Sequence, residues 1–416
     1  MENSIMIELE QQTPMWHFQP YEPGCCLRAT EVKPKLDRFI AEMRRRKDPK
    51  DNIEPPFDYK MSFEAIGEKT ILPSDEEYMN RLGRPVRRNL YPLFFGNVKA
   101  EHPKELVFYP DGIKMHLFSL DTDLLKEISG YINRFFAQTT FGTRQDKGFG
   151  AFYPKGKRFE TADASCYCFE TMYMDRSQYP ELFRYIHYFH KMIRSGINEN
   201  NNYYKSFMYF YAQSLGQTWD KPVIRYNFQM FNPVYKHLSM KRYNERFSQY
   251  RQRESMKTER EQFEKEDRYR NSSSLFRDAL GLSSVQQWKS YNTNVSVDCV
   301  EGDVERFKSP ILYRPAYIEG QNGKNGKYRV YIYLSEINNK FMDAGFRFKA
   351  EKCGKIHTTE YMKTIMKVYP QFSLEGYLDF IIEHCKSGAP ICLSGRNKYA
   401  DFIFTNRDGK VNFRKL

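Results

Sequence analysis

The sequence predicts an α+β protein with tandem ferredoxin-like (RRM-like) domains and a helical, charged insert between them. Two parts of the chain, residues 1–160 and 301–416, alternate strand-like runs with amphipathic helical runs, which is the pattern of a βαββαβ domain. The part between them, residues 161–300, combines helical spacing with a long stretch that is dense in charge. We therefore expect three parts, with boundaries near residues 160 and 300.

The first domain is expected to open with a strand at Ile5–Glu10 and a basic helix that starts near Arg28. Pro34 has no N–H and clashes with a preceding helical turn, so we place it in the first turn, with Thr30 or the chain around it as the cap. Residues 28–50 hold nine Lys or Arg and four Asp or Glu. This excess of positive charge favours phosphate contacts, although a solvated helix face has the same composition.

A strand at 113–120 and an amphipathic helix at 122–137 lead to a glycine-rich loop, Phe-Gly-Thr-Arg-Gln-Asp-Lys-Gly-Phe-Gly, at 141–150. Glycines let the backbone approach a partner closely or adopt positive φ. The loop also carries two cations and a ring between glycines. Free amides, cations and a stacking ring together favour a phosphate-and-base ligand, meaning RNA or single-stranded nucleic acid. A tight turn with solvated charges is the alternative.

These two segments together resemble the RAMP superfamily, the RNA-binding subunits of CRISPR systems. Residues 29–39 match the superfamily's entry motif, and residues 142–150 are similar to its loop Gly-x-[basic]-x-x-[basic]-Gly-[Phe/Tyr]-Gly. The subgroup that the chain resembles most is the two-domain RAMP subunit of type III-B (Cmr-type) effector complexes. The resemblance covers residues 5–155. Pro34 stands where the entry motif usually has glycine, and Asp146 adds an acid to the loop.

The resemblance implies a cytoplasmic, RNA-binding subunit of a type III CRISPR effector ribonucleoprotein. Such a subunit would hold guide RNA (crRNA) and help to capture target RNA in antiviral defence, beside other effector subunits. Its RNA-binding residues would be Arg28, Lys33, Lys35 and Arg38 of the helix, with Gly142, Arg144, Lys147, Gly148, Phe149 and Gly150 of the loop. The cations would contact phosphates and Phe149 would stack on a base, contacts that fix register and carry little sequence information.

The composition agrees with a polyanionic partner. The net charge is +13 and the pI is about 9.1, which favours association with nucleic acid. A mean hydropathy of −0.74 and the lack of a long apolar run predict no membrane span, and the first residues lack the features of a signal peptide. None of the eight cysteines forms a C-x-x-C pair, so we expect free thiols, no metal and no cofactor.

Residues 180–195 of the middle part have the apolar spacing of a helix. His187 and His190 stand three apart on it, a spacing able to bind metal, but no third ligand is evident and we interpret both as structural. Residues 236–270 hold eleven Lys or Arg and seven acids, typical of a long exposed helix or a mobile insert. Its arginines would contact RNA or an acidic neighbour, or simply face solvent.

The last part is expected to form a second, degenerate ferredoxin-like unit. Its predicted elements are strands at 307–314 and 328–334 around a turn at 320–326, a helix at 373–385, and closing strands at 403–404 and 411–413 around a turn at 406–409. In the strand at 328–334, apolar residues alternate with Arg329, Tyr331 and Tyr333. One face therefore packs, and the other is predicted to present basic and aromatic groups, as an RRM-type sheet does.

Some RAMP relatives cut RNA without a metal, using a histidine or tyrosine as general acid or base. His17 precedes the basic helix and His116 lies on the strand before the glycine-loop helix, so both are catalytic candidates. No paired-carboxylate, Ser-His-Asp or Cys-His arrangement stands out. We expect a non-catalytic RNA-binding subunit. The alternatives are a metal-independent endoribonuclease that processes CRISPR repeat RNA, and a basic protein-interaction subunit without an RNA ligand.

Overall fold

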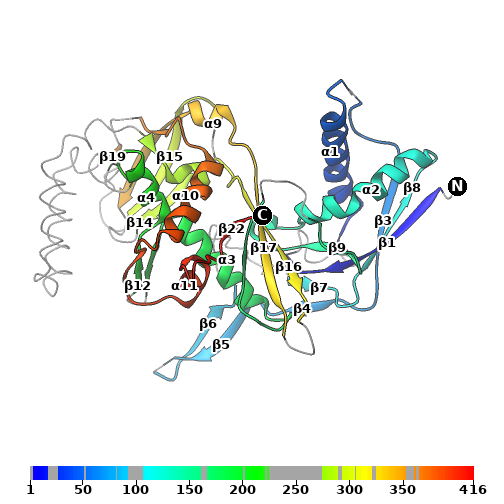
Figure 1. The fold of residues 1–416 in the computed structure, drawn as a ribbon, viewed down its shortest axis with the longest axis horizontal. Helices are drawn as coiled ribbons and strands as arrows, with labels where there is room; N and C mark the ends of the chain where they lie inside the picture. The colour runs from blue at the N-terminus through cyan, green and yellow to red at the C-terminus, as the bar shows by residue number, and fades with distance from the viewer. Residues whose placement is uncertain are drawn as a thin grey trace, which may run out of the picture. The chain divides into compact units, whose positions relative to one another are not determined.

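A computed structural model describes most of the chain, namely residues 3–16, 27–50, 53–80, 82–91, 106–160, 166–199, 202–220, 223, 274–288, 293–304, 306–320, 325–352, 360–361 and 365–416. It is a mixed α+β structure with several small, mostly antiparallel sheets (Figure 1). The chain divides into two compact units, each built from separate segments. Unit 1 contains Met1–His190, Ile311–Tyr333 and Asn397–Leu416, and unit 2 contains Lys191–Pro310 and Leu334–Arg396. The three-part division at residues 160 and 300 stays a prediction.

The first sheet of unit 1 has the order β3-β8-β1-β9 and is antiparallel throughout. Its strands are β1 (Ser4–Gln11), β3 (Lys60–Ala65), β8 (Ile113–Phe118) and β9 (Phe152–Pro154). Helix α1 (Ala29–Lys47) follows β1, and helix α2 (Thr122–Gln138) follows β8. The chain order is therefore strand, helix, strand, strand, helix, strand. Met115 of β8 pairs with Ile7 on one side and with Phe63 on the other.

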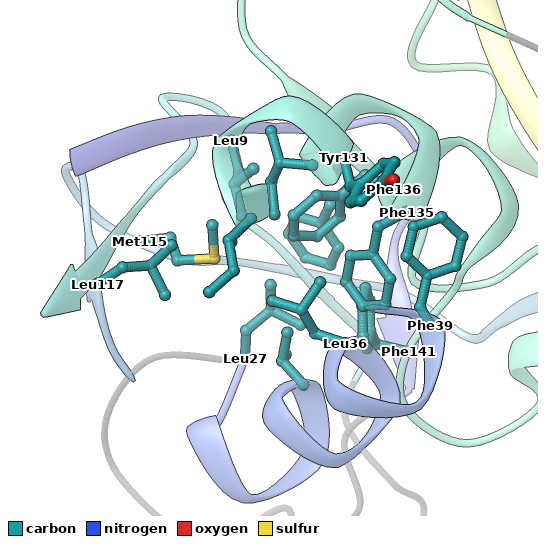
Figure 2. Packing of buried hydrophobic residues seen from close by; sticks show 14 of the residues in the cluster. Leu9, Leu27, Leu36, Phe39, Met115, Leu117, Tyr131, Phe135, Phe136 and Phe141 are labelled. Carbon is teal, nitrogen blue, oxygen red and sulfur yellow. The ribbon is translucent and has the colours of Figure 1, made fainter. Parts of the chain in front are cut away.

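Both helices cover the same face of this sheet, because alternate strand residues and the apolar stripes of α1 and α2 share one core (Figure 2). Helix α2 begins where the side chain of Asp121 accepts hydrogen bonds from the N–H groups of Asp123 and Leu124, as a capping aspartate does. The labelled members of the core in Figure 2 are Leu9, Leu27, Leu36, Phe39, Met115, Leu117, Tyr131, Phe135, Phe136 and Phe141. The predicted helix at 122–137 is confirmed.

The position of Pro34 differs from the prediction. Helix α1 begins at Ala29, so Pro34 is its sixth residue and lies in the second turn. Arg28, without a side-chain cap bond, occupies the cap position predicted for Thr30 or the chain around it. Pro34 is exposed, whereas Val32, Leu36 and neighbouring apolar residues of the helix are buried. The packing of this stripe holds the helix through a residue that costs about 3 kcal/mol in a helix interior.

A second four-stranded sheet of unit 1 has the order β16-β17-β10-β22. Its strands are β10 (Tyr167–Glu170), β16 (Ile311–Ile318), β17 (Lys327–Leu334) and β22 (Arg414–Lys415). Helix α3 (Tyr179–Arg194) follows β10, and helix α11 (Lys398–Phe404) precedes β22. The order along the chain is again strand, helix, strand, strand, helix, strand, here interrupted twice by segments of unit 2. The ring of Phe189 in α3 packs against Phe169 of β10 and Phe404 of α11.

The prediction of a strand at 403–404 is wrong, because these residues end helix α11. The side chain of Asn397 caps this helix by accepting from the N–H groups of Tyr399 and Ala400, and the buried residues of the helix recur at the spacing of a helical face. The turn at 406–409 is present, with Asp408 and Gly409 at positive φ and a bridge between Arg407 and Lys410.

Unit 1 also contains smaller elements. A three-stranded sheet has the order β2-β7-β4, with β2 (Met15–Trp16), β7 (Leu106–Phe108) and β4 (Thr70–Leu72). Strands β5 (Asp75–Met79) and β6 (Pro85–Asn89) form a separate hairpin, and η1 (Gln145–Lys147) is a short 3₁₀ helix within the glycine-rich loop.

The described residues of unit 2 form three sheets, with the orders β14-β15-β18-β19, β11-β12-β21 and β13-β20. Their strands are β11 (Ile197–Glu199), β12 (Asn202–Tyr204), β13 (Ser274–Leu275), β14 (Val285–Trp288), β15 (Thr293–Glu301), β18 (Gly345–Lys352), β19 (Glu360–Tyr361), β20 (Lys367–Val368) and β21 (Cys392–Ser394). The helical elements among its described residues are α4 (Phe207–Ser214), η3 (Arg277–Leu280), α9 (Asn339–Asp343) and α10 (Leu374–Lys386).

Helices α3 and α10 confirm the helices predicted at 180–195 and 373–385. The charged segment at 236–270 lies outside the described residues. Within the described part of the chain, no helix is both long enough and apolar enough to cross a membrane.

Candidate nucleic-acid interface

The basic helix and the glycine-rich loop lie in direct contact, although about 110 residues separate them. The ammonium group of Lys35 in α1 donates to the carbonyl oxygen of Thr140, at 3.1 Å, and to the side-chain oxygen of Gln145. Glu31, one helical turn earlier, pairs with Lys35 at 3.3 Å and accepts the N–H of Gly142 at 2.8 Å. The two segments that the sequence singles out therefore form one structure.

The three glycines of the loop serve close packing. All of them have positive φ. A Cβ at Gly150 would lie 2.0 Å from the carbonyl oxygen of Phe141, which excludes a side chain there. One at Gly148 would lie 3.0 Å from Pro315 and would be crowded and conformationally strained. The N–H groups of Gly142, Gly148 and Gly150 donate to Glu31, Gln145 and Pro14 respectively. The expectation that these amides are free for a ligand is therefore wrong.

Two of the predicted contact side chains, those of Phe149 and Lys147, are buried. Phe149 is 1% exposed, and its ring stacks on Phe183 with 3.8 Å between centroids. Lys147 is 4% exposed, and its ammonium group lies 3.7 Å from the carboxylate of Asp146. A base cannot stack on Phe149, nor a phosphate reach Lys147, in this conformation, because neighbouring side chains already cover both. Their roles in RNA binding stay predictions without support from this geometry.

Arg144 differs from the rest of the loop. Its backbone is left-handed, with φ 61° and ψ 29°, a conformation that is strained for a residue with a Cβ. Its guanidinium lies 5.5 Å from the ring of Trp16, a cation–π distance, and burial lowers its pKa. Among the described residues, no carboxylate or other acceptor pairs with this side chain. A strained backbone that positions an unpaired cation is typical of a functional site.

The other predicted cations of α1 divide into two kinds. The ammonium group of Lys33 donates to Asp37 at 2.9 Å and to the carbonyl oxygen of Phe57 at 2.7 Å, so Lys33, like Lys35, stabilises the fold. Arg38 is exposed and bonds through Nε to the carbonyl oxygen of Pro34, with no carboxylate partner among the described residues. Arg28 is half-buried at the start of the helix. Arg38 and Arg144 are therefore the cations best able to meet a ligand.

Of the two candidate catalytic histidines, His116 forms no site with other catalytic groups among the described residues. His116 lies on β8, on the face of the sheet opposite the core, where its Nε2 is 3.5 Å from the carboxylate of Glu64. His17 lies outside the described residues. In the middle region, His190 is buried, with its Nδ1 2.9 Å from the hydroxyl of Tyr313. No group of three potential metal ligands occurs in the part of the chain that is described.

Sequence reasoning missed Arg314, which is fully buried on β16. Its Nε donates to the carbonyl oxygen of Phe136 in the last turn of α2, at 3.0 Å, and its Nη2 donates to that of Phe152 on β9, at 2.7 Å. Burial lowers its pKa to about 10. Arg314 thus joins the second sheet to the end of α2, directly before the glycine-rich loop. An arginine in a strand is usually a surface residue, so no sequence signal marks it.

Two family models match the chain. The model described as the Cmr1 N-terminal domain matches residues 2–197, and that of the Cmr1 C-terminal domain matches residues 203–389. A search of curated proteins found no match. The N-terminal match includes helix α1, the glycine-rich loop and Arg144, and the two matches together span most of the chain. The chain therefore belongs to the Cmr1 family of RAMP proteins, the subunits of type III-B CRISPR effector complexes.

Proposed function

We propose that this chain binds single-stranded RNA within a type III-B effector complex, holding guide RNA and helping to capture target RNA in cytoplasmic antiviral defence, without cutting it. Membership of the Cmr1 family supports the role of effector subunit. The observation that supports RNA binding is Arg144, a cation without a paired acid among the described residues, held on Trp16 by a left-handed backbone.

The guanidinium of Arg144 is suited to a phosphate. It is planar and offers several N–H donors in a fixed geometry, and its partial burial strengthens a charge-assisted hydrogen bond to an anionic oxygen. Arg38 adds an exposed charge one helical turn beyond Lys35, the residue that contacts the loop. Contacts of this kind position the nucleic acid and read little of its sequence.

We also propose that each four-stranded sheet of unit 1, with its two helices, is a ferredoxin-like domain. The supporting observation is the spatial order: numbered along the chain, both sheets have the order 2-3-1-4 with two crossover helices. In this topology the glycine-rich loop connects the second helix of the first domain, α2, to its last strand, β9.

The test is RNA binding by the full chain, measured by fluorescence anisotropy with a labelled single-stranded 30-mer at several salt concentrations. Arg144→Ala is expected to weaken binding and to reduce the slope of log Kd against log salt by about 0.7, the value for one lost phosphate contact on a single strand. Arg46→Ala is the matched control, because it removes the same charge from an exposed residue already paired with Glu42. Equal affinity and slope for Arg144→Ala and the wild type would overturn the proposal.

A further inference from the structure

Three cations surround one carboxylate on the second sheet of unit 1. Arg329 of β17 and Arg414 of β22 donate to the Oε1 atom of Glu170, at 2.6 Å and 3.1 Å, and Lys327 donates to its Oε2 atom. Glu170 lies on β10, between the two strands that carry the arginines. Burial alone would raise the pKa of Glu170, but the hydrogen bonds from Lys327 and Arg329 lower it to about 2. The carboxylate is therefore charged at neutral pH.

This group, which we name the Glu170 cluster (Glu170, Lys327, Arg329 and Arg414), has more positive than negative charge. One carboxylate balances one cation, so two positive charges remain, and within the described residues none of the three cations has a second acidic partner. The cations also reach solvent, with exposed side-chain fractions of 28% to 38%. Like charges held this close repel one another, which an anionic ligand would relieve.

An exposed aromatic ring lies beside the cluster. Tyr173 is 72% exposed, and the ammonium group of Lys327 is 5.8 Å from its ring centroid. The flanking backbone is fixed to β17, because the N–H of Thr171 donates to Tyr328 and that of Met174 donates to Gly326. Tyr173 is therefore held in place with its ring in solvent. A cation next to an exposed ring is the arrangement that binds the phosphate and base of a single strand.

The sequence places the aromatic surface of this sheet elsewhere. It predicts that Tyr331 faces outward with Arg329, but Tyr331 is 4% exposed and stacks on Phe159. The basic part of that prediction agrees with the position of Arg329, whereas the exposed ring is Tyr173, from the segment after β10. The Glu170 cluster thus has two cations beyond the one that balances Glu170, and an exposed ring lies beside it.

We propose that the Glu170 cluster and Tyr173 form a second RNA subsite, in which the cations bind a backbone phosphate of single-stranded RNA and the adjacent base stacks on Tyr173. This inference rests on the proposed RNA-binding function and adds a site to it. Glu170 accepts hydrogen bonds from Lys327, Arg329 and Arg414 and offsets one of their three charges, and the N–H groups that it does not use face the phosphate.

The experiment compares variants of the full chain in the same anisotropy assay. Tyr173→Ala removes an exposed ring, so it is expected to weaken RNA binding with an unchanged Tm. Lys327→Ala combined with Arg414→Ala is expected to reduce the salt slope by about 0.7 to 1.4, according to whether one or two charges neutralise phosphate. The matched control combines Arg46→Ala with Lys126→Ala, two exposed cations of unit 1 that are already paired with acids.

Glu170→Gln separates a ligand site from a structural network. The substitution keeps the shape and one acceptor oxygen but removes the negative charge, so RNA is expected to bind more tightly and with a steeper salt slope. A purely structural network predicts a lower Tm and no gain in affinity. Tyr173→Ala and the double variant binding like the control, or Glu170→Gln failing to tighten binding, would each overturn the subsite.

The two proposals fail differently. If Arg144→Ala weakens binding while the Tyr173 and cluster variants behave like the control, only the second subsite is overturned. If the wild type does not bind the 30-mer, or if Arg144→Ala leaves binding unchanged, the proposed RNA-binding function at Arg144 is overturned. The Tm of each variant, measured in parallel, shows that a loss of binding does not come from unfolding.

Discussion

Asp220 and Phe276 are joined by a hydrogen bond of 2.7 Å, from the N–H of Phe276 to a carboxylate oxygen of Asp220. The second carboxylate oxygen accepts the N–H of Arg277, also at 2.7 Å. Asp220 is fully buried in unit 2, with Asp278, Arg277 and Arg194 as the charged groups around it. One side chain thus joins two segments that are 56 residues apart in the sequence. The charged segment at 236–270 lies between them in the sequence.

Asp220 makes the stability of the protein depend on pH. Burial, aided by the charge of Asp278, raises its pKa to about 6. Between about pH 4 and pH 6 the folded chain therefore holds a proton that the unfolded chain releases, and by linkage the free energy of unfolding falls as the pH rises through this window and then levels. The side chain of Asp220→Asn does not titrate, so this fall in the free energy of unfolding should be absent from the variant.

The measurement is urea unfolding of the wild type and Asp220→Asn at pH 4.5 and pH 7. We compare the free energy of unfolding of Asp220→Asn with that of the wild type at each pH. The difference is expected to shift in favour of Asp220→Asn between pH 4.5 and pH 7, because only the wild type loses stability as Asp220 releases its proton. The other groups that titrate in this range are the same in both proteins, so their effects cancel in the difference. A difference in stability that does not change with pH would contradict the prediction.

The strained backbone of Arg144 predicts different stabilities for two substitutions that both remove the guanidinium. Arg144→Gly adopts φ 61° without strain, whereas Arg144→Ala keeps the strain, so the glycine variant should be more stable by about 1 kcal/mol. Both should bind RNA equally weakly. Equal unfolding midpoints in urea would show that the left-handed conformation does not persist in solution.

The cations of α1 should separate into structural and ligand-binding residues. Lys35→Ala removes the bonds to Thr140 and Gln145, and we expect it to reduce the free energy of unfolding by about 2 kcal/mol. Arg38→Ala should change stability by less than about 0.5 kcal/mol, as an exposed residue does, but should lower the salt slope of RNA binding. Urea unfolding and anisotropy on both variants test this, and a reversed pattern would exclude the assignment.

The glycine-rich loop should tolerate no side chain at Gly150. A Cβ there would lie 2.0 Å from the carbonyl oxygen of Phe141, whereas Gly156, which also has positive φ, has no atom within 4 Å. Gly156→Ala should therefore cost only the conformational penalty of about 1 kcal/mol. Gly150→Ala should cost clearly more, because the backbone must also shift. Similar melting temperatures for the two variants would mean that the loop is not packed as described.

Helices α2, α3 and α10 were predicted from apolar spacing that is sustained over several turns, and the basic helix expected from near Arg28 is present as α1. The position of Pro34 was not predictable from local rules, because the burial of Val32 and Leu36 in the core outweighs the cost of the proline. The apolar pair at 403–404 is too short to distinguish a strand from the end of a helix, and only the cap at Asn397 identifies the helix.

For the candidate site, the sequence singled out two segments that lie in contact in the structure, but it did not show which side chains are accessible. A ring between glycines looks the same whether a ligand or a core residue covers it, and here Phe183 of α3 covers Phe149. The sequence also could not show that Lys35 and Glu31 are committed to the loop, since that contact spans about 110 residues. The accessible cations follow only from the tertiary packing.

Strand β10 lies between β17 and β22, and this has a consequence for the synthesis of the chain. The ribosome makes Tyr167–Glu170 well before either neighbour, because one partner begins at Lys327 and the other at Arg414. At about 5–20 residues per second, both edges of β10 stay unpaired for roughly 8 seconds or more. Unpaired strand edges can pair with other chains, so the nascent protein is most vulnerable to aggregation in this interval. The interval ends when β17 and then β22 pair with β10.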